Sequence, residues 1–345
     1  MHFFERRVTD TRYALQRACT HGCPSTASVV AVTVGGVVAK RVGLGLVAVW
    51  GVLTTVFALF TLTGDWVLQE EVGLARWSGA SETSVETLRQ EYLASRGLDR
   101  PLLDQYLDWL GNMVTLDWGP SFATGEPAFS LVVDAATRTA MYVLPAVALA
   151  VVAGLLIGLY AALRPESRLA STGMGTAYLV FALPNFWVGG IVLSLALDGV
   201  VGESALVFEH LLPVLLTTTA LLGGYASYTR AYGREYATAE FVDLVRAKGA
   251  SERRVAVHVL RNAAIPVVSM LFTEVLTLLV LAVFVIEALF GIEGLGLVLV
   301  RAIESRDLPV VLGGTVVIIG VGVVGSVVQD LSYRALDPRV DTGSR

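Results

Sequence analysis

The sequence is short of cysteine and lysine, and both shortages exclude kinds of chemistry. Its two cysteines, Cys19 and Cys23, lie close together near the amino terminus, so the body of the chain has no disulfide framework. Its two lysines are Lys40 and Lys248, and neither follows a glycine. A phosphate-binding loop of the Gly-Lys-Ser/Thr kind is therefore excluded, and we expect neither ATP chemistry nor a cofactor on this chain.

Charged residues are also scarce, and apolar residues take their place. Only 16% of the 345 residues are charged, 54% are hydrophobic and the mean hydropathy is +0.67, which indicates a membrane protein. A helix needs about 20 mostly apolar residues to cross a bilayer. Six stretches meet this requirement and predict an all-α integral membrane protein with six transmembrane helices: Val42–Thr63, Thr139–Leu163, Gly173–Leu197, Leu211–Tyr228, Ala263–Val285 and Pro309–Val328.

The charges between these stretches predict the orientation of the chain, because cytoplasmic loops hold an excess of Arg and Lys. One set of segments carries 18 basic and 9 acidic residues: 1–41, 164–171, 230–264 and 332–345. The other set carries 6 basic and 19 acidic residues: 64–137, 198–210 and 286–308. The first set is expected inside and the second outside, so six spans leave both termini in the cytoplasm and place the protein in the cell membrane.

The outer segment 64–137 has a helical pattern of its own. Apolar residues recur at spacings of three and four, first at Val85, Leu88 and Tyr92 and then at Tyr106, Leu110 and Met113. We expect a small helical cap on the outer mouth. The expected organisation is a flexible cytoplasmic extension 1–40, a first transmembrane helix 41–63, the outer segment 64–137, a five-helix core 138–331 containing the cytoplasmic loop 230–264, and a cytoplasmic tail 332–345.

The extension contains a small group of soft-metal ligands. Cys19, His21 and Cys23 lie within five residues of one another. A structural zinc site needs four ligands at established spacings, so a flexible tail is favoured over a metal site and no metal is predicted.

The cytoplasmic loop between the fourth and fifth spans has a pattern of helix, stop and helix. Ala237, Phe241, Leu244 and Val245 share one face of the first helix, and Gly249 suits the left-handed position that ends it. A serine two residues later can cap the second helix. An apolar face on a basic loop predicts a docking surface for a partner; the alternative is a helix lying on the membrane surface.

At this point the residues resemble a known family, the permease subunits of dipeptide, oligopeptide and nickel ABC importers. The resemblance is to the type with a large outer segment after the first span, and it covers roughly residues 37 to 340. It rests on the cytoplasmic signature and on stretches elsewhere in the chain: Asp243–Gly249, Leu260–Ala263, Gly97–Pro101, Leu183–Trp187, Glu287–Gly296 and Asp337–Arg339.

The resemblance implies the type I ABC importer permease fold and a set of partners. The chain would form half of a translocation pathway as a heterodimer with a sister permease, with two ABC ATPase subunits inside, an extracellular solute-binding protein outside, and a small solute, above all a peptide, as cargo. It also implies which residues contact the ATPase: Asp243, Ala247, Lys248, Gly249 and Ser251. Leu244 and Val245 depart from the signature, which has small residues there.

Polar residues within the spans are candidates for the pathway. Glu274 is the one acidic side chain in the middle of a predicted span, where a charge costs roughly 2.5 to 3.5 kcal/mol on insertion scales. It would meet a peptide's ammonium group in a wet cavity or form a hydrogen bond at a subunit interface. Asn185, Ser269 and Thr273 are weaker candidates, because Ser and Thr often bond to their own helix.

Other functions remain as alternatives. A secondary transporter predicts several charges within the membrane and an internal repeat, whereas the sequence has one such charge and no visible repeat. A membrane enzyme is less favoured, because no span carries paired aspartates or a His-Glu pair. Nickel or sugars could replace peptide as the cargo of a closely similar permease. Nothing in the sequence indicates a nucleic acid partner.

Overall fold

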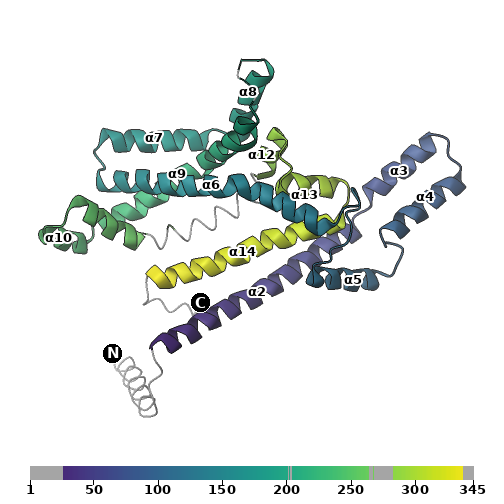
Figure 1. Cartoon of the computed structure of the whole chain (residues 1–345), viewed down its shortest axis with the longest axis horizontal. Coiled ribbons are helices and arrows are strands. Elements are labelled where there is room, and N and C mark those ends of the chain that lie inside the picture. Colours follow the sequence, from purple (N-terminus) through teal and green to yellow (C-terminus); the bar gives the residue numbers. More distant parts are fainter. Residues whose placement is uncertain (1–25, 201, 203, 264–266, 268–282, 337–345) are drawn as a thin grey trace, which may run out of the picture.

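The computed structural model describes residues 26–336 apart from 201, 203, 264–266 and 268–282. Helices make up nearly all of this part, and two prolines form the one isolated β-bridge found in it. The molecule is elongated, with the cap helices at one end and α10 at the other (Figure 1). The labelled elements are α2 Thr26–Leu62, α3 Trp66–Trp77, α4 Glu82–Ser95, α5 Leu102–Thr115, α6 Ala128–Leu163, α7 Arg168–Ala182, α8 Asn185–Leu197, η2 Leu206–Leu211, α9 Leu212–Ala237, α10 Glu240–Ala247, α12 Val283–Phe290, α13 Leu295–Glu304 and α14 Leu308–Leu336.

Four helices are long and apolar enough to cross a membrane, and two bent helix pairs bring the number to six. The pairs are α7 with α8, bent by 79°, and α12 with α13, bent by 87°. The predicted fifth span lies mostly outside the described residues. The four long spans fall within Arg41–Trp77, Ala128–Leu163, Leu206–Ala237 and Leu308–Ser332.

The predicted third span is broken near its middle. Leu183 is extended, with φ −77° and ψ 126°, and Pro184 precedes the first residue of α8. A proline cannot donate to the preceding turn and disfavours helical geometry in the residue before it. The span predicted over Gly173–Leu197 therefore consists of two helices joined at a bend, because Pro184 turns the chain sharply between α7 and α8.

Small residues bring α6 and α9 into close contact. A side chain added at Gly154 would come within 2.6 Å of the Tyr225 side chain, and one added at Gly158 would come within 2.6 Å of Thr229. Such contacts let helix backbones approach closely where lipid provides no hydrophobic driving force. This pair is the centre of the membrane bundle, and α7 packs against both helices.

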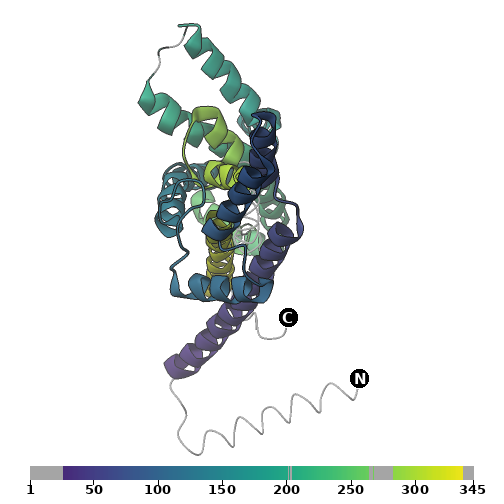
Figure 2. The same cartoon turned by 90° about the vertical axis from the view of Figure 1, so that its right-hand side faces the viewer.

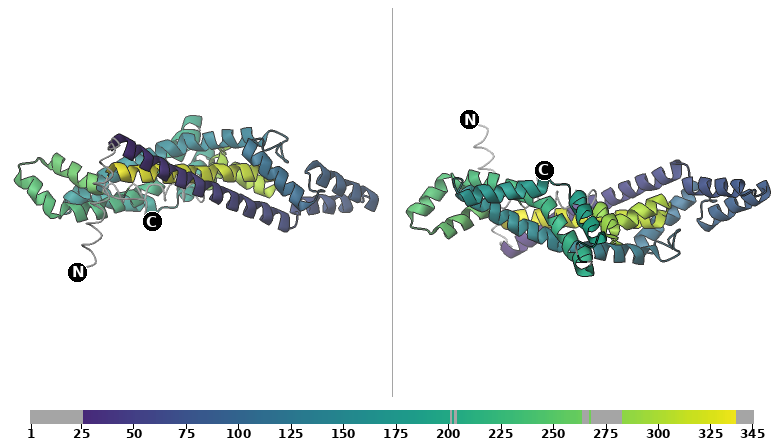
Figure 3. Two further views of the ribbon diagram at one scale, coloured as in Figure 1. Left: turned by 90° about the horizontal axis from the view of Figure 1, so that it is seen from below. Right: turned by 90° about the horizontal axis from the view of Figure 1, so that it is seen from above.

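The first and last spans form a second pair, in which α2 crosses α14 (Figure 3). A side chain at Gly45 would meet Val323 at 2.7 Å, so the two helices nearly touch there. Nearby, Arg41 holds Asp330 through two hydrogen bonds of 2.6 and 3.1 Å. The helix α2 begins at Thr26, well before the predicted first span, because no proline interrupts its sequence. Residues 26–40, within the expected extension 1–40, belong to this helix.

The outer segment forms the cap that its periodicity predicts. In α4, Val85 and Tyr92 are buried against Leu68 and Val72 of α3. Viewed from the cap end, α5 lies across α2 (Figure 2).

The contact between α5 and α2 is aromatic and polar. Trp109 stacks on Phe57 with ring centroids 5.5 Å apart. The hydroxyl of Tyr106 accepts a 2.9 Å hydrogen bond from the indole of Trp50. The cap is thus anchored on the outer half of the first span.

Candidate functional site

The cytoplasmic loop folds as a helical hairpin, here called the coupling hairpin, made of α10, a turn at 248–251 and the helix 252–263. Its core consists of Val242, Val255 and Val259, which are at most 1% exposed. Leu159 and Leu163, at the inner end of α6, pack against this core. The hairpin is therefore a packed unit seated on the inner ends of α6 and α9.

Gly249 forms the turn of the coupling hairpin. Its φ is +76°, the left-handed region that favours glycine, and its N–H donates a 2.8 Å hydrogen bond to the carbonyl of Arg246. The next N–H, of Ala250, donates to Val245. On the far side, the carbonyl of Ser251 accepts hydrogen bonds from two residues of the second helix. The predicted left-handed stop is confirmed.

The residues predicted to contact an ATPase gather at the tip of the hairpin. All five are exposed: Asp243, Ala247, Lys248, Gly249 and Ser251. Asp243 and Ala247 lie one helical turn apart on α10, and the other three lie in the turn at 248–251. The five therefore share one exposed surface of the hairpin. This surface is here called the tip surface.

The apolar stripe predicted as a docking face is mostly internal. Phe241 and Val245 pack against the valine core. Ala237 belongs to α9, because that helix ends at Ala237 and α10 begins only after residues 238–239. Only Leu244 points outward, with 58% of its surface exposed. The prediction is wrong for the other three, because a second helix of the same loop covers them.

At the outer end of the bundle, Glu287 is fully buried, with 0% of its surface exposed. Its carboxylate accepts hydrogen bonds from the Thr139 hydroxyl at 2.6 Å, the Tyr142 hydroxyl at 3.2 Å and the N–H of Leu297 at 2.8 Å. The Thr139 hydroxyl in turn accepts from the N–H of Leu295 at 2.7 Å. One carboxylate therefore joins α12 and α13 to α6.

Two glycines make room for this anchor. A side chain at Gly294 would collide with the Glu287 carboxylate, and one at Gly296 would come within 2.7 Å of the backbone of Phe284. The sequence prediction treated 286–308 as an outer loop and did not assign this role to Glu287. The signal was present as an acid at the end of a long apolar stretch, followed by closely spaced glycines.

A second network joins the cap to the bundle. Arg306, buried and with φ +53°, donates to the carbonyls of Phe60 and Gly64 and pairs with Asp65 at 3.5 Å. Asp65 accepts from the Tyr92 hydroxyl at 3.1 Å.

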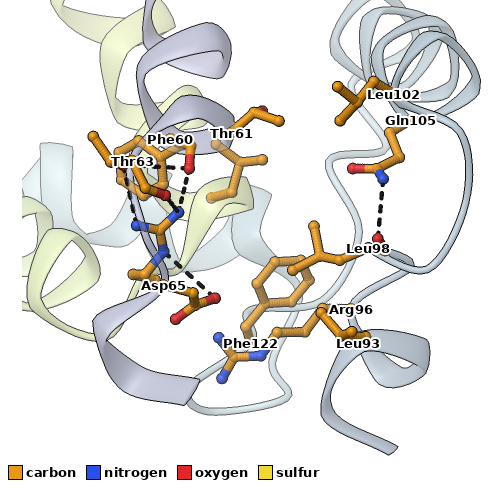
Figure 4. A pocket seen from close by; sticks show the side chains of 12 residues that line it. Phe60, Thr61, Thr63, Asp65, Leu93, Arg96, Leu98, Leu102, Gln105 and Phe122 are labelled. Carbon is orange, nitrogen blue, oxygen red and sulfur yellow. Dashed lines mark hydrogen bonds and ion pairs between the residues drawn. The ribbon is translucent and has the colours of Figure 1, made fainter. Parts of the chain in front are cut away.

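The other side of this network is formed by the cap. The Tyr92 hydroxyl accepts a 2.5 Å hydrogen bond from Arg96. Asp65, Arg96 and Arg306 are among the residues that line a cavity of about 270 Å³ between the end of α2 and the cap (Figure 4). Arg96 and Phe122 lie side by side in this view, and Gln105 closes the opposite wall. Burial raises the pKa of Tyr92, so the hydroxyl stays protonated as the donor to Asp65.

Comparison with known families decides the assignment. Residues 154–342, more than half of the chain, match the family of binding-protein-dependent transport system inner membrane components. The chain belongs to this family. The match begins within α6 and includes the coupling hairpin, Glu287 and α14.

Several curated relatives are bacterial permeases. The chain is 32% identical over 269 residues to the oligopeptide transport system permease protein AppB of Bacillus subtilis, covering 73% of this chain and 85% of that one. It is 30% identical over 297 residues to the dipeptide transport system permease protein DppB of the same organism, covering 84% and 95%. It is 31% identical over 336 residues to the di/tripeptide transport system permease protein DppB of Pseudomonas aeruginosa, covering 88% and 98%.

This permease is a multi-pass protein of the cell membrane and a transport subunit of an ABC importer. The family is one of membrane permease subunits, so the chain is not itself an enzyme. The secondary transporter considered as a rival is not favoured. The predicted type I permease fold is confirmed.

The predicted pathway residues are only partly described. The Asn185 amide donates a 2.8 Å hydrogen bond to the carbonyl of Leu216, and its oxygen lies 3.5 Å from the Thr219 hydroxyl. It therefore ties the start of α8 to α9 at the bend. The other three candidates, Ser269, Thr273 and Glu274, lie outside the described residues.

Metal ligands were also considered in the sequence. Within the described ranges there is no group of three or more His, Cys, Asp or Glu side chains that could hold a metal ion. Cys19, His21 and Cys23 lie outside these ranges.

Proposed function

We propose that this permease forms one half of the pathway of a peptide importer. The other half would be a sister permease, with two ABC ATPase subunits at the cytoplasmic end and a solute-binding protein outside. The support is that relatives named as oligopeptide, dipeptide and di/tripeptide permeases align with 73 to 88% of this chain. Peptide is therefore the cargo class, and ATP hydrolysis belongs to the separate subunits.

Energy enters, in this proposal, through the tip surface of the coupling hairpin. The tip surface carries a negative charge on Asp243 of α10 and a positive charge on Lys248 of the turn, beside the small residues Ala247 and Gly249. Small residues at a helix end allow a partner's backbone to approach, and exposed Leu244 adds one apolar contact. The exposed tip surface is the one observation that carries the coupling proposal, since the hairpin contacts the bundle through its opposite, valine-lined face.

The hairpin then acts as a lever. Closure of two ATPase subunits around ATP would move the hairpin as a rigid body, because its valine core is closed and packed on Leu159 and Leu163. The helix α9 runs almost directly into α10, with a break of only two residues at 238–239. Movement of the tip would be passed to α6 and α9, whose glycine contacts hold them together.

The test measures ATP hydrolysis and peptide uptake together, in the reconstituted importer with its binding protein. Asp243→Lys reverses a charge on the tip surface. Gly249→Pro removes the N–H bonded to Arg246 and cannot adopt a φ of +76°. Both variants should insert normally and lose most uptake, with ATP hydrolysis no longer stimulated by loaded binding protein.

The matched control is Glu166→Lys, which reverses an exposed acid in the other cytoplasmic loop. It should transport like the parent. Unchanged uptake in Asp243→Lys and Gly249→Pro would refute the coupling role. Uptake of sugars or nickel, with no uptake of any peptide, would refute the cargo class and leave the coupling role standing.

A further inference from the structure

A polar cavity opens at the inner end of the bundle, between α7 and α9. Its volume is about 280 Å³, and Pro165, Ser171, Tyr178 and Arg230 are among the residues that line it. It lies on the same side of α9 as the hydrogen bond between the Tyr178 and Ser227 hydroxyls. The cavity is separate from the tip surface and from the networks at the outer end.

Arg230 brings a charge into this cavity without a protein partner. It is partly buried, and within the described part of the chain its guanidinium makes no hydrogen bond or ion pair. A guanidinium has five N–H donors in a planar fork that matches the oxygens of a phosphate. Burying part of such a group without a partner is unfavourable, so the cavity is suited to an oxyanion.

The surrounding charges have the same sign. Arg164 and Arg168 flank the start of α7, and Arg234 follows Arg230 by one turn of α9. Two acids are close in sequence, Glu166 and Glu235, so these segments carry four basic and two acidic residues. Both acids are exposed, whereas Arg230 is drawn into the cavity. The net local charge therefore favours an anion.

Apolar side chains complete the walls of the cavity beside its polar groups. Ala170 and Met174 are buried and form part of the lining. Outside it, Leu179 lies one turn of α7 after the lining residue Gly175 and is 64% exposed. A ligand that fills the cavity must combine an oxyanion with an apolar body that can lie along α7. A free inorganic anion has no such body.

The depth of Arg230 fits the headgroups of the inner leaflet. It lies seven residues before the end of α9, which is about 10 Å along a helix axis. Cytoplasmic loops identify this end as the inner one. Anionic lipids concentrate on the cytoplasmic leaflet, and basic pockets between transmembrane helices on that side bind their headgroups.

We propose that the cavity between α7 and α9 is a binding site for an anionic phospholipid of the inner leaflet. The phosphate pairs with Arg230 and accepts from the Ser171 hydroxyl, while an acyl chain lies along α7 at Leu179. The site would hold α7 against α9 from the lipid side. It is independent of the cargo of the importer.

The test is native mass spectrometry of the intact transporter complex, released from nanodiscs that contain equal amounts of phosphatidylglycerol and phosphatidylcholine. The parent should retain phosphatidylglycerol in clear preference. Arg230→Gln should lower the retained phosphatidylglycerol at least tenfold, and Arg230→Lys should lower it less, since a lysine is a point charge without the planar fork. Arg254→Gln, an exposed arginine of the coupling hairpin, is the matched control and should retain the lipid.

Other outcomes would overturn the proposal. Equal retention in the parent and in Arg230→Gln would do so, as would an absence of preference for phosphatidylglycerol in the parent. A second arm adds inorganic phosphate at millimolar concentration during release. Complete displacement of the lipid by phosphate would assign the site to a free anion. If Arg230→Gln does not assemble, Arg230→Lys alone decides, and its retention must then fall below that of the control.

Discussion

The anchor at Glu287 allows a prediction with a magnitude. In Glu287→Ala, three donors lose their acceptor: the hydroxyls of Thr139 and Tyr142 and the N–H of Leu297. A buried donor left without a partner costs about 1 to 3 kcal/mol. Three such donors, and the hole left by the side chain, should destabilise the outer end of the bundle by at least about 3 kcal/mol.

This destabilisation is measured by thermal unfolding of the purified permease in detergent. Unfolding is followed by the fluorescence of a dye that does not react with thiols. A destabilisation of about 3 kcal/mol should lower the apparent Tm by about 5 °C or more. Glu287→Gln should fall between the parent and Glu287→Ala, because an amide keeps one oxygen but turns its NH₂ toward the other donors. The control is Glu304→Ala, which removes an exposed acid at the end of α13.

A Glu287→Ala protein that melts within about 1 °C of the Glu304→Ala control would refute this reasoning. At about 2 to 4 °C per kcal/mol, such a difference is well below the expected loss of about 3 kcal/mol. Equal losses in Glu287→Ala and Glu287→Gln would also contradict it. In that case the carboxylate would matter for its charge rather than for the three hydrogen bonds.

Three further predictions concern the bundle and the cap. Gly158→Val should prevent close packing of α6 on α9, because its Cβ would lie 2.5 Å from the carbonyl oxygen of Ala226. We expect little folded protein by size-exclusion chromatography. Gly175→Ala is the control and should fold, because no atom lies within 4 Å of the added Cβ. Arg41→Ala should lower the apparent Tm, because it leaves the Asp330 carboxylate, which is 10% exposed, without its partner. The double variant Arg41→Met with Asp330→Leu should recover most of this loss. Equal melting of the single and double variants would contradict the prediction. Burial raises the pKa of the Tyr92 hydroxyl above its ordinary 10.0. Its contribution to cap stability is therefore complete below about pH 10 and is lost as the pH rises beyond it. In an alkaline unfolding titration followed by circular dichroism, the stability of Tyr92→Phe should depend less on pH above about pH 10 than that of the parent.

Much of the architecture could be predicted because the membrane imposes simple rules. Length and hydropathy located the long helices, and the count of Arg and Lys oriented them. The periodicity at Val85 and Tyr92 located a cap helix, since an amphipathic helix in water must bury one face. Gly249 could be recognised because a left-handed helix end strongly favours glycine.

What could not be predicted depends on contacts between distant segments. Phe241 and Val245 looked like a docking face because the sequence does not show that the next helix folds back over them. Glu287 looked like one more acid of an outer loop, since its partner Thr139 lies 148 residues away. Pro184 disfavours a continuous helix over the third span, but the angle of 79° between α7 and α8 cannot be read from that residue alone.

The central claim, that the tip surface of the coupling hairpin receives the ATPase, is tested most directly by cross-linking. Ser251→Cys and Glu166→Cys are made separately, because both positions are exposed and cytoplasmic. Each permease is assembled with ATPase subunits that carry engineered surface cysteines. The complex is treated with a short bifunctional thiol reagent, and the products are identified by mass spectrometry. The account predicts a permease–ATPase product for Ser251→Cys whose yield changes when ATP is added, and none for Glu166→Cys. A product of equal yield from both positions, or none from Ser251→Cys with any ATPase cysteine, would contradict it.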